Sequence, residues 1–445
     1  MRVDRTRRPQ ASTPRRLRLP EIECMTLSNN LRVEFVPRRE VPEVSLRLIL
    51  ESGAAAEPPD QAGLSELTSR LLTEGTADRD ALHMASWLDR LGASYSASSG
   101  YSVATISMHL FSDVLVDAIE FLATTVTQAE FPENEVKRVR SERVDEIDRE
   151  RDEPSMVAGQ ALISELYEDG LYGRPVGGTA ESIPLIERRD VCDFYRNWYV
   201  PDGALLIACG DIERRPLIEA VEAHLCKWQG VSQRVQAPPD PPRKPGRILL
   251  ADRPGSPQAE IRVGTIGVPY GTPNHHAIIV ANAILGGLFN SRINMNLREE
   301  KGWTYGARSS FGFRRGAGPF VVHTAVESGV TAQAFQEILG EIKTMRKELV
   351  TEDELDLAKH ALTLSLPLQF ESARQITSKI AQQRIYDLSE EYWEVYRDRI
   401  EEVTAEQVRE VCETYLTRDR MTLLAVTDAE SVLEPLSELG TVNLV

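Results

Sequence analysis

The chain repeats itself at a nearly constant separation, and this internal repeat limits the fold more than any other feature. Glu133 and Glu352 lie 219 positions apart, and each stands at the start of a long charged helix. Val191 and Val408 lie 217 positions apart, and each belongs to a segment that ends in tyrosine and precedes an apolar strand. Repetition over such a distance indicates two copies of one structural unit.

A proline-rich stretch separates the two copies. Residues 229–245 hold five prolines among polar residues, which is typical of a semi-rigid linker. We therefore predict four parts. Residues 1–20 form a disordered basic arm, 21–228 the first domain, 229–245 the linker and 246–445 the second domain.

Hydrophobic periodicity indicates the same mixture of elements in both halves. Strands are expected where apolar residues alternate and helices where they recur every three or four positions. Expected strands cover 32–37, 45–51, 101–110, 260–268, 307–313 and 320–326. Expected helices include 61–73, 81–91, 277–285 and 293–300, and several long helices should follow one another from 113 to 170. The pairs Thr351/Glu354 and Thr404/Gln407 have the form of capping boxes, so helices should begin there. Strands grouped with strands predict an α+β fold with two homologous domains, each a mostly antiparallel sheet packed against helices.

Charge and composition exclude several classes of protein. The net charge of −17 argues against nucleic acid as a partner, because phosphate binding needs a basic surface. No apolar stretch approaches the ~20 residues of a membrane helix, so no membrane insertion is expected. Residues 1–19 hold seven arginines and one aspartate, which indicates a solvated tail, with a mitochondrial transit segment as the alternative.

Cysteine and histidine spacing gives no metal motif. The five cysteines are odd in number and form no C-x-x-C pair, which fits buried or incidental thiols. No two of the seven histidines are three or four positions apart. His275 and His276 are adjacent, so on a helix they would point about 100° apart.

Residues 284–305 carry a long and specific pattern. They contain L-G-G-x-F-x-S-R followed by L-R-E-x-x-G-x-x-Y. This pattern resembles the C-terminal domain of the pitrilysin/insulinase family of zinc metallopeptidases, which includes mitochondrial processing peptidase and its bacterial relatives. Residues 171–179 and 199–203 look like landmarks of the family's first domain. The resemblance covers most of the chain and implies the LuxS/MPP-like metallopeptidase fold.

The resemblance also shows what the first half lacks. Active members carry H-x-x-E-H on the first helix, where two histidines bind zinc and the glutamate is the general base. Here these positions fall on Glu66, Ser69 and Arg70, so both histidines and the base are missing. Glu146 lies close to where the family places its third ligand. Glu66 and Arg70 are spaced for an ordinary helical ion pair. We expect no zinc on this chain.

The second half keeps the family's other functional pair. The resemblance places an arginine and a tyrosine, which position and polarise the scissile carbonyl, on Arg298 and Tyr305. A guanidinium and a phenol are suitable donors for an oxyanion. Arg292 is a weaker candidate. The plain alternative is that Arg298 pairs with neighbouring glutamates and that Tyr305 is an ordinary strand residue.

This asymmetry implies a zinc-free subunit, inactive alone, of a heterodimeric peptidase. The partner would be a homologous catalytic subunit that carries H-x-x-E-H and zinc, and the substrate an extended peptide added to a sheet edge. One alternative is a silent structural subunit similar to respiratory-complex core proteins. Another is a homodimer that binds a metal through Glu66 and Glu146. The glycine segment at Gly286 is short, which favours a bacterial-type, cytoplasmic protein over one of the mitochondrial matrix.

Overall fold

The first half of the chain builds a six-stranded sheet. The computed structural model describes residues 20–168, 170–233, 235, 238–239, 241–242 and 244–445, so the predicted arm and parts of the linker lie outside it. The strand order is β1-β2-β6-β3-β5-β4, and only β2 and β6 run parallel to each other. The strands are β1 (Glu23–Thr26), β2 (Arg32–Pro37), β3 (Glu43–Leu50), β4 (Ser94–Ser99), β5 (Ala104–Phe111) and β6 (Leu205–Gly210).

The second half repeats five of these six strands in the same order. Its order is β12-β7-β11-β8-β10-β9, so β7, β11, β8, β10 and β9 take the places of β2, β6, β3, β5 and β4. Here β7 runs parallel to β11 and β12, and the other pairs are antiparallel. The strands are β7 (Ile248–Asp252), β8 (Gln258–Ile266), β9 (Ala307–Phe311), β10 (Pro319–Glu327), β11 (Thr422–Thr427) and β12 (Val442–Leu444). The predicted α+β fold with two homologous domains is confirmed, whereas the predicted limits at residues 228 and 246 stay a prediction.

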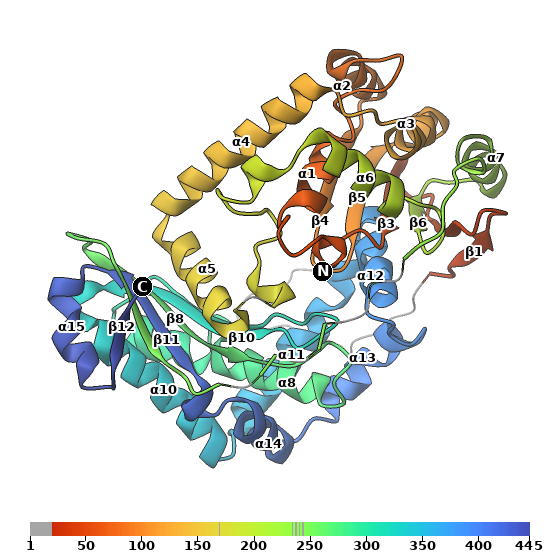
Figure 1. Ribbon diagram of the computed structural model, residues 1–445. Helices are drawn as coiled ribbons and strands as arrows, with labels where there is room; N and C mark the ends of the chain where they lie inside the picture. The colour runs from red at the N-terminus through yellow and green to blue at the C-terminus, as the bar shows by residue number, and fades with distance from the viewer. Residues whose placement is uncertain (1–19, 169, 234, 236–237, 240, 243) are drawn as a thin grey trace, which may run out of the picture.

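Helices cover both sheets (Figure 1). Capping boxes close the starts of α11 and α14, as the sequence predicts. The first half holds α1 (Leu64–Leu71), α2 (Ala81–Leu91), α3 (Leu115–Thr127), α4 (Glu133–Asp152), α5 (Pro154–Tyr167), α6 (Arg188–Trp198) and α7 (Arg214–Leu225). The second holds α8 (His275–Asn282), α9 (Arg292–Asn294), α10 (Thr331–Lys347), α11 (Glu352–Ser365), α12 (Ala373–Ile385), α13 (Tyr392–Glu401), α14 (Ala405–Tyr415) and α15 (Ala429–Ser437). Two π-helical segments, η5 (Ala283–Gly287) and η6 (Met295–Glu300), continue α8 and α9.

Each domain lends one helix to the other. Helix α12 packs against β3 and β6 of the first sheet, where its Ile376 and Ile380 are buried against Ile49 and Ile207. Helix α5 packs against β8 and β11 of the second sheet, where Leu162 meets a small apolar cluster. Figure 1 shows α5 reaching the second sheet and α12 beside the first. The two domains are therefore interlocked and share buried apolar surface.

The loop between β9 and β10 strengthens the junction. Arg315 makes two hydrogen bonds of 2.7 Å with the carboxylate of Glu51 in the first domain. The neighbouring Arg314 guanidinium lies 4.1 Å from the ring centroid of Tyr101 and 4.5 Å from that of Tyr172. Cation–π contacts of this kind hold a desolvated guanidinium against aromatic faces.

One helical run, His275–Glu300, is long and apolar enough to cross a membrane by length and composition alone. Just over half of its most apolar stretch is buried within the protein. Ile278, Leu285 and Leu297 on this run belong to the apolar core of the second domain. The run therefore contributes to that core.

Candidate functional site

Helix α1 presents the residues that stand at the zinc-motif positions. Leu64, Leu67 and Leu71 are buried in the first core, so Glu66 and Arg70 lie on the opposite, partly exposed face. This division follows from the 3.6-residue period of the helix. The fold therefore keeps the orientation that a motif on this helix needs.

The structure brings Glu66, Arg70 and Glu146 together. Arg70 Nε donates to Glu66 Oε1 at 2.9 Å, which confirms the expected helical pair. Arg70 Nη1 donates to both oxygens of Glu146 on α4, at 3.0 and 2.8 Å. The Arg70 guanidinium thus lies between the two carboxylates that the sequence places at ligand positions.

Arg143 extends this arrangement along α4, which the sequence analysis did not foresee. Its Nη1 donates to Glu146 at 3.0 Å and to Glu150 at 2.8 Å. Arg143 precedes Glu146 by three residues and Glu150 by seven, so helical spacing was the signal available in the sequence. Glu66, Arg70, Glu146, Arg143 and Glu150 form an alternating series of charges, which we call the ion-pair ladder.

The ladder favours the charged form of its members. Burial acts to raise the pKa of Glu146, but hydrogen bonds from Arg143 and Arg70 outweigh it and hold the pKa below its usual range. Burial likewise acts to lower the pKa of Arg70, yet Glu66 and Glu146 raise it overall. The cation at the centre of the ladder is therefore permanent.

Ser69 stands where active members carry the general base. Its hydroxyl lies 2.9 Å from the hydroxyl of Tyr199 and donates to the carbonyl of Ser65 at 3.0 Å. Ser69 is buried. A serine hydroxyl cannot replace a carboxylate as general base. Through its contact with Tyr199, Ser69 instead joins α1 to the end of α6.

These residues do not fit zinc. Catalytic zinc is held by imidazole, thiolate and carboxylate donors around an open position, whereas the central side chain here is itself a cation. Among the described residues, no group of three or more histidines, cysteines or acidic residues could hold a metal ion. The alternative of a metal held by Glu66 and Glu146 is disfavoured for the same reason, because Arg70 already neutralises both.

Arg298 and Tyr305 lie in the second domain, and no contact joins them to the ladder within the described part of the chain. Arg298, on η6, stacks on Phe289 at 4.4 Å and approaches Glu299 only to 3.6 Å. The side chain of Tyr305 is 95% exposed and has no hydrogen-bond partner among the described residues. Arg298 thus forms the ion pair with a neighbouring glutamate that the plain alternative expects, at a distance longer than a hydrogen bond.

Arg292, the weaker candidate, is used by the fold. Its Nε and Nη2 donate to both carboxylate oxygens of Glu354, at 2.6 and 2.8 Å. Glu354 also accepts the backbone N–H of Thr351 and so completes the capping box of α11. Arg292 therefore joins α9 to α11 and is not free to contact a substrate.

The edge strands β4 and β9 differ in how far side chains cover their outward backbone groups. At the edge strand β9, Asn294 accepts the N–H of Ala307 and Asn282 donates to the carbonyl of Ser309, so polar side chains cover the edge. At the edge strand β4, the N–H of Ser99 donates to Glu66 at 2.8 Å. In an antiparallel sheet, the backbone groups of every second residue of an edge strand point away from the sheet. The β4 residues in step with Ser99 therefore point their N–H and C=O groups outward. Beyond Ser99, no described element pairs with them.

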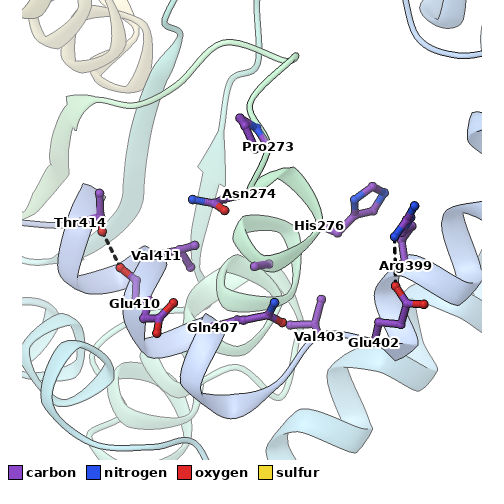
Figure 2. Close-up of a pocket in the computed structure, with 11 residues that line it drawn as sticks. Pro273, Asn274, His276, Arg399, Glu402, Val403, Gln407, Glu410, Val411 and Thr414 are labelled. Atoms are coloured by element: carbon purple, nitrogen blue, oxygen red, sulfur yellow. Dashed lines mark hydrogen bonds and ion pairs between the residues drawn. The ribbon is translucent and has the colours of Figure 1, made fainter.

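The adjacent residues His275 and His276 lie away from the ion-pair ladder, and His276 lines a pocket of its own. His275 is buried and stacks on Tyr270 at 4.5 Å, and burial lowers its pKa to about 4. His276 points instead into a pocket of about 300 Å³ between α8, α13 and α14 (Figure 2). The two imidazoles diverge, as expected. Arg399 in the pocket pairs with Glu402 at 3.2 Å, and the lining mixes acidic, basic and amide groups without a set of metal donors.

Comparisons with known proteins show the family of this chain. A family model described as Insulinase (Peptidase family M16) matches residues 33–180, and one described as Peptidase M16 inactive domain matches residues 186–362. The chain belongs to peptidase family M16. It is a member that lacks the H-x-x-E-H motif, as the residues on α1 show.

Relatives are similar over nearly the whole chain. The beta subunit of mouse mitochondrial-processing peptidase is 25% identical, over 93% of this chain and 86% of its own. The uncharacterised zinc protease YmxG of Bacillus subtilis is 24% identical, over 80% and 87%. The crystal structure of a peptidase M16 inactive domain from Pseudomonas fluorescens has a TM-score of 0.83 at 25% identity, covering 92% of this chain and 98% of that one. A chain of complex III2 from Candida albicans matches with a TM-score of 0.77 at 17% identity, over 95% of this chain and 100% of that one, which shows a shared fold.

Proposed function

We propose that this chain is the zinc-free subunit of a heterodimeric, peptide-degrading metallopeptidase and that it supplies Arg298 and Tyr305 to the partner's active site. The observation that carries the proposal is the contrast between Arg298 and Tyr305 on one side and Arg292 on the other. The fold uses Arg292 in a two-point ion pair with Glu354. It leaves Tyr305 almost fully exposed and holds Arg298 only by a 3.6 Å ion pair with Glu299 and by the ring of Phe289. Donors that the fold holds in this way are available to a substrate.

The chemistry of the pair fits peptide hydrolysis. A zinc ion on the partner would polarise the scissile carbonyl and activate water. Arg298 and Tyr305 would donate hydrogen bonds to the carbonyl oxygen as it gains negative charge, which is where fixed donors accelerate acyl transfer. Phe289 beneath the guanidinium would hold Arg298 in place. Alone, the chain would hydrolyse no peptide.

The substrate class that we propose is an extended peptide. The outward backbone groups of β4 are suitable for strand addition, whereas asparagines cover those of β9. The net charge of −17 favours basic peptides over acidic ones at the encounter stage.

The test is to reconstitute the chain with a homologous subunit that carries H-x-x-E-H and to measure cleavage of a quenched fluorescent peptide. We expect the Arg298→Ala and Tyr305→Phe variants each to lower kcat by about 10²-fold, the loss typical of one oxyanion donor. The complex should still assemble. The control is Arg308→Ala, which removes another exposed arginine of the second domain. Full kcat in the double variant would refute the proposal.

The second candidate is a silent structural subunit, favoured by the likeness to the complex III chain. The two functions differ in one observable. The complex captured with this chain from its native lysate should show chelator-sensitive peptide hydrolysis if the chain is half of a peptidase. A captured complex without hydrolysis would favour the structural role, and Arg298 and Tyr305 would then have no catalytic use.

A further inference from the structure

In the ion-pair ladder, the Arg70 guanidinium lies between the two carboxylates that stand at the ligand positions of the family's metal site. Arg70 contacts both Glu66 on its own helix and Glu146, 76 residues further along the chain. We propose that the Arg70 guanidinium is a built-in cation that replaces a metal ion: it neutralises Glu66 and Glu146, joins α1 to α4 and prevents divalent cations from binding there.

The charges on the two carboxylates require such a partner. The side chain of Glu66 is 15% exposed and that of Glu146 is 35% exposed, so solvent screens them only in part. Without the guanidinium, Glu146 would keep its bond from Arg143 but Glu66 would have no cationic partner among the described residues, and the two carboxylates would repel each other across the contact between the helices. Removing one partner of a poorly solvated ion pair is costly because it leaves the other charge uncompensated.

The hydrogen bonds also explain why a metal ion would find no ligand. Both oxygens of Glu146 accept from Arg70, and Oε2 accepts from Arg143 as well. Glu66 Oε1 accepts from Arg70, and its Oε2 accepts the N–H of Ser99. All four oxygens are thus engaged, and any arriving cation would meet the positive charge of Arg70.

The test compares the full chain with an Arg70→Met variant, which keeps much of the side-chain volume and removes the charge. Mn²⁺ is the probe, because hard carboxylate oxygens suit it. The variant should melt several degrees below the wild type in EDTA, and millimolar Mn²⁺ should recover at least half of that loss. Titration calorimetry should show one new Mn²⁺ site in the variant. The control is Arg215→Met, which removes an exposed helical pair with Glu219 and should show neither effect.

A double variant separates charge from packing. Arg70→Met combined with Glu146→Gln removes one cation and one anion, so it should be more stable than Arg70→Met alone and indifferent to Mn²⁺. If Arg70→Met does not fold, a folded double variant still supports the proposal, and failure of both refutes it. Refutation would equally follow if the wild type bound Mn²⁺ or Zn²⁺ at a site that Arg70→Met abolishes, or if the folded Arg70→Met variant ignored Mn²⁺. None of these readouts depends on peptide hydrolysis.

Discussion

At the scale of single residues, two arginines six positions apart show how local context decides a role. Arg292 is largely buried and its fork matches the Glu354 carboxylate, which is the geometry that makes arginine pairs strong. Arg298 is partly exposed and rests on an aromatic ring. Both are arginines of one sequence pattern, but Arg292 has a two-point ion pair, whereas Arg298 has a single, longer one with Glu299.

The pair with Arg292 predicts an acid-sensitive contribution to stability. Hydrogen bonds from Arg292 and Thr351 outweigh the effect of burial and lower the pKa of Glu354 to about 2. Because the folded-state pKa lies below the unfolded value, the stabilisation is present above about pH 4.5 and is lost as the pH falls towards 2. A Glu354→Gln variant should be about 2 kcal/mol less stable near neutral pH, as expected for charged hydrogen bonds.

Urea denaturation of the wild type and the variant at several pH values checks this prediction. The difference between the two should shrink below pH 4.5 and disappear near pH 2. Glu352→Gln, at an exposed position in the same helical turn, is the control and should show a much smaller difference. A difference independent of pH would mean that packing, and not charge, accounts for the loss.

At the scale of elements, α1 depends on a buried carboxyl that the sequence analysis missed. Glu57 accepts the backbone N–H of Gly63 at 3.2 Å and of Ser65 at 2.7 Å, so it caps the helix that carries Glu66 and Arg70. Gly63 has φ of +95°, and a Cβ there would lie 2.6 Å from Ile183. The start of α1 is thus set by a carboxyl in the segment just before the helix and by a position that only glycine fits.

The Glu57 cap predicts a stability that falls as the pH rises, opposite to the effect expected for Glu354. Burial outweighs the two backbone hydrogen bonds and raises the pKa of Glu57 to about 7. Since the folded-state pKa lies above the unfolded value, the contribution of Glu57 to stability is complete below about pH 4.5 and is lost as the pH rises through 7. A Glu57→Gln variant lacks this loss, so the stability of the wild type relative to the variant should fall between pH 4.5 and 7. Thermal melts across that range measure it, and a constant difference would contradict the assignment.

At the scale of the whole molecule, the exchange of α5 and α12 makes the halves interdependent. The face of the first sheet that α12 covers includes Val36, Ile49 and Ile207, all buried. That face belongs to one domain and its cover to the other. A proline-rich connection would permit independent domains, yet the packing does not.

This interlock predicts that the first domain is not stable in isolation. A fragment of residues 20–228 keeps its sheet but loses α12, so its uncovered apolar face should bind a hydrophobic dye and associate on size-exclusion chromatography. Addition of residues 244–445 in trans should reduce dye binding. The intact chain is the reference. A monomeric fragment that binds no dye would show that the first domain does not need α12.

Sequence periodicity alone was enough for most of the strands and helices, for the repeat and for the α+β class. The strands and helices depend on residues a few positions apart, and the two-domain organisation follows from the internal repeat. Periodicity missed the short strands β1, β7 and β12. It also missed β4, because Ser94–Ser99 is mostly serine and becomes a strand only by pairing with β5. The family resemblance, and not periodicity, assigned the motif positions to Glu66, Ser69 and Arg70 and so implied that both zinc histidines are missing.

The side chains that fill the place of those histidines, and the way in which the halves fit together, depend on contacts between residues far apart in the sequence. Periodicity shows that a helix has an apolar face but not which sheet will bury it, so the exchange of α5 and α12 was beyond its reach. The contact between Arg70 and Glu146 joins residues 76 positions apart, and its direction depends on how α1 packs against α4. The charge types were readable from the chain, whereas their convergence is a property of the packed helices.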